Sequence, residues 1–304
     1  MKKLIFAVAL LVAATGKTQA QTDSVGHVLD NVVVTGTRNT ADVRHLPMNI
    51  SVVGREKLTE NQRNNVLPTL SEQVPGLFVT ARSIMGYAVS DGAAGGISLR
   101  GIGSGAGRVM VLIDGHPQYQ GIFGHSISDS YQSMIAEKVE VVRGPASMLY
   151  GSNAMGGVVN IVTRKMPGNG VKTDISLGAG SYGTFQGEFT NRVRKGGFYS
   201  VLSGQYGRSD NHRPHMGFEQ YGGYLKLGYD FSPHWTAYAD VDVTHFNSSY
   251  PGSTHEPLSG ARQWITRGVA TAVVENHYGN TSGAVSVYHN FGRHKICRRR
   301  GTAG

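Results

Sequence analysis

Cysteine and long apolar runs are the scarcest features of this sequence. The 304 residues include one cysteine, Cys297, which cannot form a disulfide within the chain. Beyond residue 20, no stretch approaches the roughly 20 consecutive apolar residues that a membrane-spanning helix requires. These absences exclude internal disulfides and a helical membrane protein, so a role in a membrane could come only through strands.

Acidic residues are few as well, but the excess of positive charge is confined to the two ends of the chain. The formal net charge is +9. The two ends contain no acidic residue and hold seven basic ones: Lys2, Lys3, Lys17, Lys295, Arg298, Arg299 and Arg300. Residues 21–294 therefore carry a net charge of +2. A nucleic-acid-binding domain needs a basic stripe on a folded face, and this pattern shows none, which excludes nucleic acid as a partner.

Residues 1–20 have the pattern of a secretory signal peptide. Two lysines precede the apolar run Leu4–Ala14, which is too short to span a bilayer, and small residues lead to Ala20. We expect export from the cytoplasm and a mature chain that begins at Gln21. Residues 21–40 then form a polar leader in the periplasm.

A glycine-rich loop follows the strand-like segment "ISL", with glycines at 101, 103, 105 and 107. A dinucleotide-binding loop opens a helix, whose N-terminus binds phosphate. Here the loop is followed by the apolar run Val109–Ile113, which predicts a buried strand. The loop is therefore expected to join two strands, which disfavours a nucleotide-dependent enzyme. No Ser/His/Asp or paired-carboxylate arrangement has supporting context, so we expect no enzyme and no cofactor.

Residues 41–166 mix short strands, short helices and glycine turns, which predicts a compact α+β domain. The pattern predicts a strand around 50–53, helical turns over 55–62, a helix that starts near Pro68, and strands over 77–80 and 158–163.

After residue 170 the chain becomes a series of long strands with two different faces. In 224–231, leucines and aromatics alternate with polar residues and glycine, and 235–244 alternates in the same way. Alternation over about ten residues, with aromatics near the ends, is typical of outer-membrane barrel strands; the alternative is a soluble sandwich, whose strands are usually shorter. Seven strands are predicted, over 171–179, 184–193, 197–207, 219–231, 234–246, 266–278 and 282–291.

Apart from a tight first turn at 180–183, short and long connections alternate between these strands, as in transmembrane barrels. Seven strands cannot close a barrel around a domain of this size, which needs about 22, so the chain alone should not insert stably. The last residues, 295–304, abandon the alternation, and we interpret them as an aberrant tail from an interrupted reading frame. The alternative is a basic tail on a short secreted protein.

Several segments resemble the plug domain of TonB-dependent outer-membrane receptors in their order and spacing. They are "NVVVTGTR", "LPMNISVVG", "LSEQVPGLFV", "ISLRGIG", "VMVLIDG" and "VEVVRGPASMLYGSNAMGGVVNIVT". The resemblance implies an α+β plug (41–166) followed by the N-terminal part of an antiparallel transmembrane β-barrel (171–294), about seven of 22 strands. It implies uptake of a ferric siderophore, haem, cobalamin or similar chelate at the outer membrane, driven through TonB.

The resemblance also assigns roles to particular residues. The segment Asn31, Val32, Val33, Val34, Thr35 and Gly36 is similar to the TonB box, which adds a strand to an edge of TonB. Arg100 and Arg143 match plug arginines that pair with barrel glutamates. Glu188 is one candidate partner, Glu137 and Glu140 are candidates within the plug, and solvated arginines are the alternative.

Ligand contact is implied for the plug loops 83–95, 103–107 and 118–125, among whose residues we single out Gly103, Ser104, Gly105, Tyr119 and Phe123. His212 and His215 are weak candidates for metal or haem iron; the alternative is solvated loop histidines, because no third ligand of fixed spacing is near. Two further histidines, His116 and His125, flank a plug loop.

The expected location is the outer membrane of a Gram-negative bacterium, with lipid, TonB and an extracellular chelate as partners. The truncated product, if it persists, would be periplasmic and would not transport. The alternative function is a stand-alone secreted module that binds a ligand or TonB.

Overall fold

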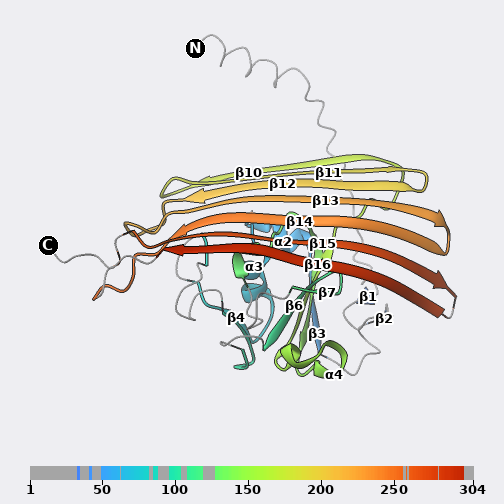
Figure 1. Ribbon diagram of the computed structural model, residues 1–304, viewed down its shortest axis with the longest axis horizontal. Helices are drawn as coiled ribbons and strands as arrows, with labels where there is room; N and C mark the ends of the chain where they lie inside the picture. The colour runs from blue at the N-terminus through green and yellow to red at the C-terminus, as the bar shows by residue number, and fades with distance from the viewer. Residues whose placement is uncertain are drawn as a thin grey trace, which may run out of the picture. The chain divides into compact units, whose positions relative to one another are not determined.

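The computed structural model describes two layers packed together within one compact unit, Val33–Gly304: an α/β layer and a long antiparallel sheet (Figure 1). The described residues are 33–34, 41–42, 49–61, 63–81, 85–87, 96–103, 108–118, 127–255, 258, 260–279 and 281–297. No helix in these ranges is long and apolar enough to cross a membrane.

The long sheet consists of seven strands in sequence order, as predicted. Each strand pairs antiparallel with the next, and the ladder is continuous from the first to the last. The strands are β10 (Gly170–Gly180), β11 (Thr184–Lys195), β12 (Phe198–Ser209), β13 (Phe218–Ser232), β14 (Trp235–Ser249), β15 (Arg262–Tyr278) and β16 (Thr281–Cys297). Two-residue turns lie at one end of the sheet, and the other end has the longer loops 210–217 and 250–261 and a tight three-residue turn, 181–183, between β10 and β11.

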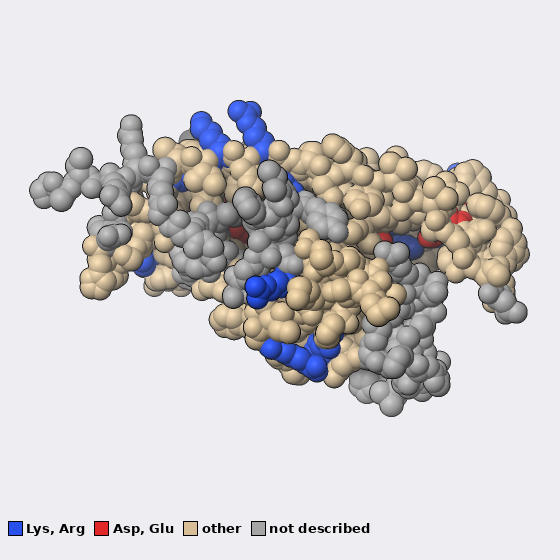
Figure 2. Space-filling model, turned by 60° about the horizontal axis from the view of Figure 1, so that its bottom comes forward, with Lys and Arg blue, Asp and Glu red and all other residues tan. Residues whose placement is uncertain are grey.

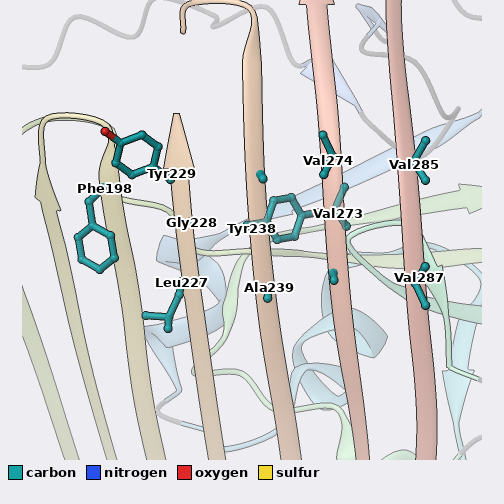
Figure 3. A pocket seen from close by; sticks show the side chains of 12 residues that line it. Phe198, Leu227, Gly228, Tyr229, Tyr238, Ala239, Val273, Val274, Val285 and Val287 are labelled. Atoms are coloured by element: carbon teal, nitrogen blue, oxygen red, sulfur yellow. The ribbon is translucent and has the colours of Figure 1, made fainter. Parts of the chain in front are cut away.

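Alternation along each strand separates an apolar face from a polar one. In β13, Leu225 and Leu227 are 43% and 45% exposed, whereas Lys226 between them is fully buried against the α/β layer. The apolar face therefore points away from that layer, which confirms the predicted two-sided strands. On this outward side a shallow apolar depression crosses β12–β16, lined by Phe198, Leu227, Tyr229, Val274, Val285 and Val287 (Figure 3).

The last strand is longer than the sequence pattern predicts. β16 pairs with β15 as far as Cys297, which lies opposite Arg262, so the first three residues of the expected tail belong to the strand. The prediction failed here because it followed side-chain alternation, whereas main-chain hydrogen bonds to the neighbouring strand define the ladder.

The α/β layer is built on a mixed five-stranded sheet. Its strand order is β3-β8-β9-β6-β7, with β6 and β9 parallel and the other neighbours antiparallel. A separate pair, β4 with β5, lies outside this sheet, and β1 pairs with β2. The bounds are β1 (Val33–Val34), β2 (Ala41–Asp42), β3 (Ile50–Gly54), β4 (Leu77–Val79), β5 (Ile97–Leu99), β6 (Val109–Ile113), β7 (His116–Pro117), β8 (Ala136–Arg143) and β9 (Gly157–Thr163).

The helices are short: α2 (Arg55–Glu60), α3 (Val66–Gln73), α4 (Ser147–Tyr150) and the 3-10 turns η2 (Ser128–Ser130) and η3 (Ser152–Ala154). Helices α2 and α3 lie where the sequence pattern predicts them. Helix α3 begins two residues before Pro68, because Asn65 caps it: the Asn65 Oδ1 accepts a hydrogen bond from the Leu67 N–H at 2.8 Å. Pro68 is tolerated there because the first turn of a helix has no intrahelical acceptor for its N–H groups.

The glycine loop joins strand to strand, as predicted: β5 ends at Leu99 and the fully buried β6 begins at Val109. Gly103 has a φ of +143°, and a Cβ there would lie 2.4 Å from the Ile97 carbonyl oxygen. Glycine is therefore required for the close return of the chain to β5.

The two layers share a hydrophobic core. Val201, Tyr224 and Val269 of the long sheet belong to the same buried cluster as the core of the α/β layer, which includes Leu70 and Leu99. Packing therefore ties the α/β layer to the sheet, and separating them would expose apolar surface of both.

Gly157→Ala is expected to lower the free energy of unfolding by about 1 kcal/mol more than Gly144→Ala. Both glycines have a positive φ, +145° and +138°, so alanine strains the backbone at both positions. At Gly157 an added Cβ would lie 2.3 Å from the Val142 carbonyl oxygen, whereas at Gly144 it would meet nothing within 4 Å. Urea unfolding in detergent micelles measures both; equal losses would show that the close approach to Val142 has no energetic effect.

Candidate functional site: the interface between the two layers

The polar face of the long sheet forms one wall of a buried polar interface. Hydroxyl, amide and charged side chains of β11–β15 are buried there against the α/β layer: Thr190, Ser203, Gln205, Gln220, Lys226, Asp240, Asp242, Thr244, Gln263 and Thr271. A buried polar group is costly unless it is hydrogen-bonded, so its partners across the interface determine how the layers are held together.

A buried ion pair joins β13 to the turn between β6 and β7. The Lys226 Nζ lies 2.8 Å from the Asp114 Oδ2 and donates a second hydrogen bond, at 3.0 Å, to the Thr163 Oγ1. The ammonium also lies 4.1 Å from the centroid of the Tyr238 ring, within cation–π range. Lys226 is thus fully buried and has a charged, a polar and an aromatic partner.

Asp114 is fixed from its own layer as well. Its φ is +47°, a left-handed conformation that aspartate tolerates, and it starts the Asp-Gly turn after β6. The carboxylate accepts hydrogen bonds from the Thr163 N–H at 2.8 Å and the Thr163 hydroxyl at 2.6 Å. Burial alone would raise the pKa of Asp114, but the charge of Lys226 and the hydrogen bonds from Lys226 and Thr163 outweigh it and lower the pKa to about 2.

Two glutamines make further contacts across the interface. The Gln132 Nε2 donates to the Asp242 Oδ1 at 2.5 Å, and the Gln220 Nε2 donates to the Asp129 backbone carbonyl at 2.8 Å. Gly222 provides room for the first contact, since a Cβ there would lie 1.7 Å from the Gln132 Oε1. The inner face of β13 therefore fits the α/β layer closely at this point.

Glu188 of β11 contacts the α/β layer, but with a partner that the sequence did not indicate. Its carboxylate accepts a hydrogen bond from the Ser133 hydroxyl at 2.6 Å and lies 3.8 Å from an Arg55 guanidinium nitrogen. Glu188 pairs with Arg55 rather than with Arg100 or Arg143.

The two arginines singled out from the sequence lie elsewhere. Arg100 is exposed in the turn after β5, and among the described residues it forms no ion pair. Arg143 ends β8 and donates a hydrogen bond to the Asn49 Oδ1. The candidate partners within the domain are used otherwise: Glu137 lies 3.9 Å from Arg164, and Glu140 lies 2.9 Å from Lys138. A contact of Arg100 or Arg143 with further strands stays a prediction.

Four buried carboxylates contribute to the charge distribution on the surface. Asp129, Glu140, Asp240 and Asp242 are all less than a tenth exposed. On the face seen in Figure 2, lysine and arginine side chains accordingly cover more of the visible surface than aspartate and glutamate do. These four of the 20 acidic residues are therefore withdrawn from the surface.

At the end of the sheet with the longer loops, Asn211 connects the two layers. Its Oδ1 accepts a hydrogen bond from the Met85 N–H at 3.0 Å, and its Nδ2 donates to the Met85 carbonyl at 3.1 Å. Of the loop residues expected to contact ligand, Gly103 lies in the described part of the chain; Ser104, Gly105, Tyr119 and Phe123 lie outside the described residues.

The segment predicted to bind TonB is described only in part. Val33 and Val34 form β1, paired with Ala41 and Asp42, so this backbone is extended. Asn31, Val32, Thr35 and Gly36 lie outside the described residues.

The histidines are placed separately. His212 and His215 are exposed in the loop between β12 and β13, and no group of three or more metal-ligating side chains occurs in the ranges that the structure describes. His116 packs against Tyr288 with ring centroids 5.5 Å apart, and burial lowers its pKa. His125 lies outside the described residues.

Sequence reasoning missed Lys226, Asp114 and Asp242 as interface residues. The signal for Lys226 was present, because a lysine on the same face as Tyr224 in an alternating strand must find a buried counter-charge. Its partner Asp114 gave no such signal, because an aspartate before a glycine is common in turns.

Comparison with known proteins shows what this chain is similar to. Residues 42–158 match the family model described as TonB-dependent Receptor Plug Domain. The vitamin B12 transporter BtuB of Vibrio vulnificus is 28% identical over 257 residues, covering 83% of this chain and 39% of that protein. The hemin receptor of Yersinia enterocolitica is 33% identical over 156 residues, covering 51% of this chain and 21% of the receptor.

The fold is shared with solved receptor structures. The ferripyoverdine receptor of the outer membrane of Pseudomonas aeruginosa, bound to ferripyoverdine, matches with a TM-score of 0.73 at 18% identity, over 88% of this chain and 37% of the receptor chain. The chain thus spans less than half the length of each of these three proteins. By sequence and by fold, it contains a TonB-dependent receptor plug domain, followed by seven strands arranged as in the barrels of these receptors.

Proposed function

We propose that the chain functions as part of an outer-membrane receptor for the TonB-energised uptake of a ferric siderophore, haem, cobalamin or a similar chelate. One observation carries the proposal: the plug packs against the polar face of a sheet whose opposite face is apolar. A sheet with one polar and one apolar face suits a wall between an aqueous lumen and lipid. Relatives named as transporters and receptors, rather than enzymes, support it.

The buried polar contacts favour a plug that works inside a barrel over a stand-alone secreted module. Lys226, Asp242 and Glu188 of the strands all have partners in the plug. A secreted plug would leave the plug partners of these groups, such as Asp114, without their counterparts. The strands and the plug therefore act as one unit in the proposed receptor.

We propose a scarce metal chelate as the ligand and do not propose a narrower class. The compared proteins are named for vitamin B12, hemin and ferripyoverdine, three chemically different metal complexes. Loops rather than the shared scaffold usually select among ligands. We assign ligand contact to the plug loops that include Gly103, Ser104, Gly105, Tyr119 and Phe123.

Gene deletion in the source bacterium tests the transport proposal. Uptake of labelled ferric siderophores, haem and cobalamin is measured under limitation, with and without a protonophore. We expect the deletion to abolish uptake of one of these ligands, and the protonophore to have the same effect on the parent strain. Unchanged uptake of the whole panel, or recovery of the protein only from the soluble fraction, would contradict the proposal.

Val34→Pro is expected to abolish this uptake while leaving the amount of protein in the outer membrane unchanged. We propose that residues 31–36 add a strand to TonB, and proline removes a backbone N–H that such pairing uses. Val34→Thr is the matched control, because it keeps the N–H and a β-branched side chain. Full uptake by the proline variant would argue that this segment does not bind TonB.

A further inference from the structure

A second polar site lies near the short-turn end of the sheet. A cavity of about 430 Å³ lies between α2, the end of β9 and the first two strands of the long sheet. Its charged lining consists of Arg55, Arg164, Lys172, Arg192, Glu137, Asp174 and Glu188. Four cations therefore face three carboxylates, and the cavity has an excess of positive charge.

Two of these arginines are almost completely buried and share one carboxylate. Arg164 and Arg192 are 4% and 7% exposed. Their Nη2 atoms lie 2.5 Å and 3.0 Å from the same oxygen of Asp174, the Oδ2. Glu137 adds a second, more distant carboxylate, with its Oε2 3.9 Å from the Arg164 Nε. The excess of positive charge in the cavity therefore comes from its whole lining, four cations against three carboxylates, and includes Lys172.

Both guanidinium groups also have buried nitrogens that no hydrogen bond satisfies. Among the described residues, the Arg164 Nη1 and the Arg192 Nε have no acceptor, although neither is accessible to bulk solvent. The Arg192 Nη1 donates to the Lys165 carbonyl at 3.3 Å, so only part of that fork is used. Buried N–H donors normally have an acceptor, so these two cationic groups keep unused capacity to hydrogen-bond an oxyanion.

The remaining cations extend the site toward solvent. Lys172 is exposed and has no ion pair in the part of the chain that the structure describes. Arg55 is already engaged, with Glu188 at 3.8 Å and with the Ser133 carbonyl at 2.5 Å. Lys172 can thus approach an anion from the open side while Arg164 and Arg192 bind it from within.

We propose that this cavity is a binding site for a small oxyanion, a phosphate or carboxylate group, held by Arg164, Arg192 and Lys172. Guanidinium N–H groups match the oxygen spacing of such anions. The cavity lies between the plug and the first two strands of the sheet, and apart from Ile175 its lining is polar or charged, so we assign it a soluble anion. The proposal rests on the buried arginines and is independent of the proposed function.

Calorimetric titration with inorganic phosphate tests the site, using the full chain folded in a non-ionic detergent at constant ionic strength. We expect saturable binding of one phosphate per chain. Arg192→Gln should weaken it at least tenfold, and Lys172→Gln, at an exposed position where folding is not at stake, about threefold or more. Arg208→Gln is the matched control, because Arg208 is an exposed arginine of the same sheet, paired with Asp210 and remote from the cavity.

A parallel titration with a short-chain phosphatidic acid separates a soluble anion from a lipid headgroup. Binding of the lipid phosphate at this site, lost in Lys172→Gln, with no binding of inorganic phosphate, would contradict the assignment to a soluble anion. Absence of saturable phosphate binding by the folded wild type would overturn the proposal. Equal phosphate affinity in all three variants would overturn it as well.

Discussion

Lys226→Met is expected to lower the free energy of unfolding by about 3–5 kcal/mol. Methionine fills nearly the same volume, but it removes the ammonium that lies 2.8 Å from the Asp114 carboxylate. The carboxylate would then be buried opposite an apolar side chain, and the Thr163 hydroxyl would lose a donor at 3.0 Å. Urea unfolding of the chain in detergent micelles measures the change.

The double variant Lys226→Met with Asp114→Asn separates the lost charge pair from lost packing. Asparagine keeps the size of Asp114 and tolerates its φ of +47°. With both charges removed, the double variant should recover most of the stability that Lys226→Met loses. If the double variant is as unstable as the sum of the two single variants, the two side chains do not interact and the pair does not hold the plug to the sheet.

The strands could be predicted from the sequence because their signal is local. A period of two places Leu225 and Leu227 on one face and Lys226 on the other, whatever the rest of the chain does. Main-chain pairing then follows sequence order, so seven strands with short turns have one simple arrangement. The limit of this signal is visible in β16, where the ladder continues to Cys297 after the alternation ends.

The interface could not be predicted in the same way, because alternation shows which face is buried and not what covers it. Lys226 and Asp114 are 112 residues apart, and no local pattern relates them. Glu188 illustrates the same limit. Its position on the polar face was clear from the sequence, but its partner Arg55 was not, because Arg55 lies at the start of a helix whose sequence resembles an ordinary surface turn. Packing between layers sets these pairs.

The family resemblance did not remove that limit. It directed attention to Arg100 and Arg143, yet in the described part of the chain the first forms no ion pair and the second bonds Asn49. Among the described residues of the α/β layer, the cations that form ion pairs with carboxylates of the strands are Arg55 and Arg164. A motif identifies a residue type that recurs, whereas burial and geometry decide which cation of this chain meets which carboxylate.

Acid is expected to weaken the plug–sheet interface through Asp114. The charge of Lys226 and the hydrogen bonds from Lys226 and Thr163 hold its pKa at about 2, below the value of about 3.9 in an unfolded chain. Because the folded pKa is the lower one, the stabilisation is fully present above about pH 4 to 5 and is lost as the pH falls through 2. The contribution lost between pH 5 and pH 2 is about 2 kcal/mol.

Comparison with the double variant isolates this effect from other carboxylates that titrate in acid. Lys226→Met with Asp114→Asn cannot lose the Asp114 contribution, so its free energy of unfolding should fall by about 2 kcal/mol less than that of the wild type between pH 5 and pH 2. Parallel pH profiles for the two proteins would mean that Asp114 has the same pKa in the folded and unfolded chain. The interactions of the carboxylate with Lys226 and Thr163 would then only offset the cost of its burial, and the net attachment of the plug would come from the amide contacts of Gln132 and Gln220 and from the shared apolar core.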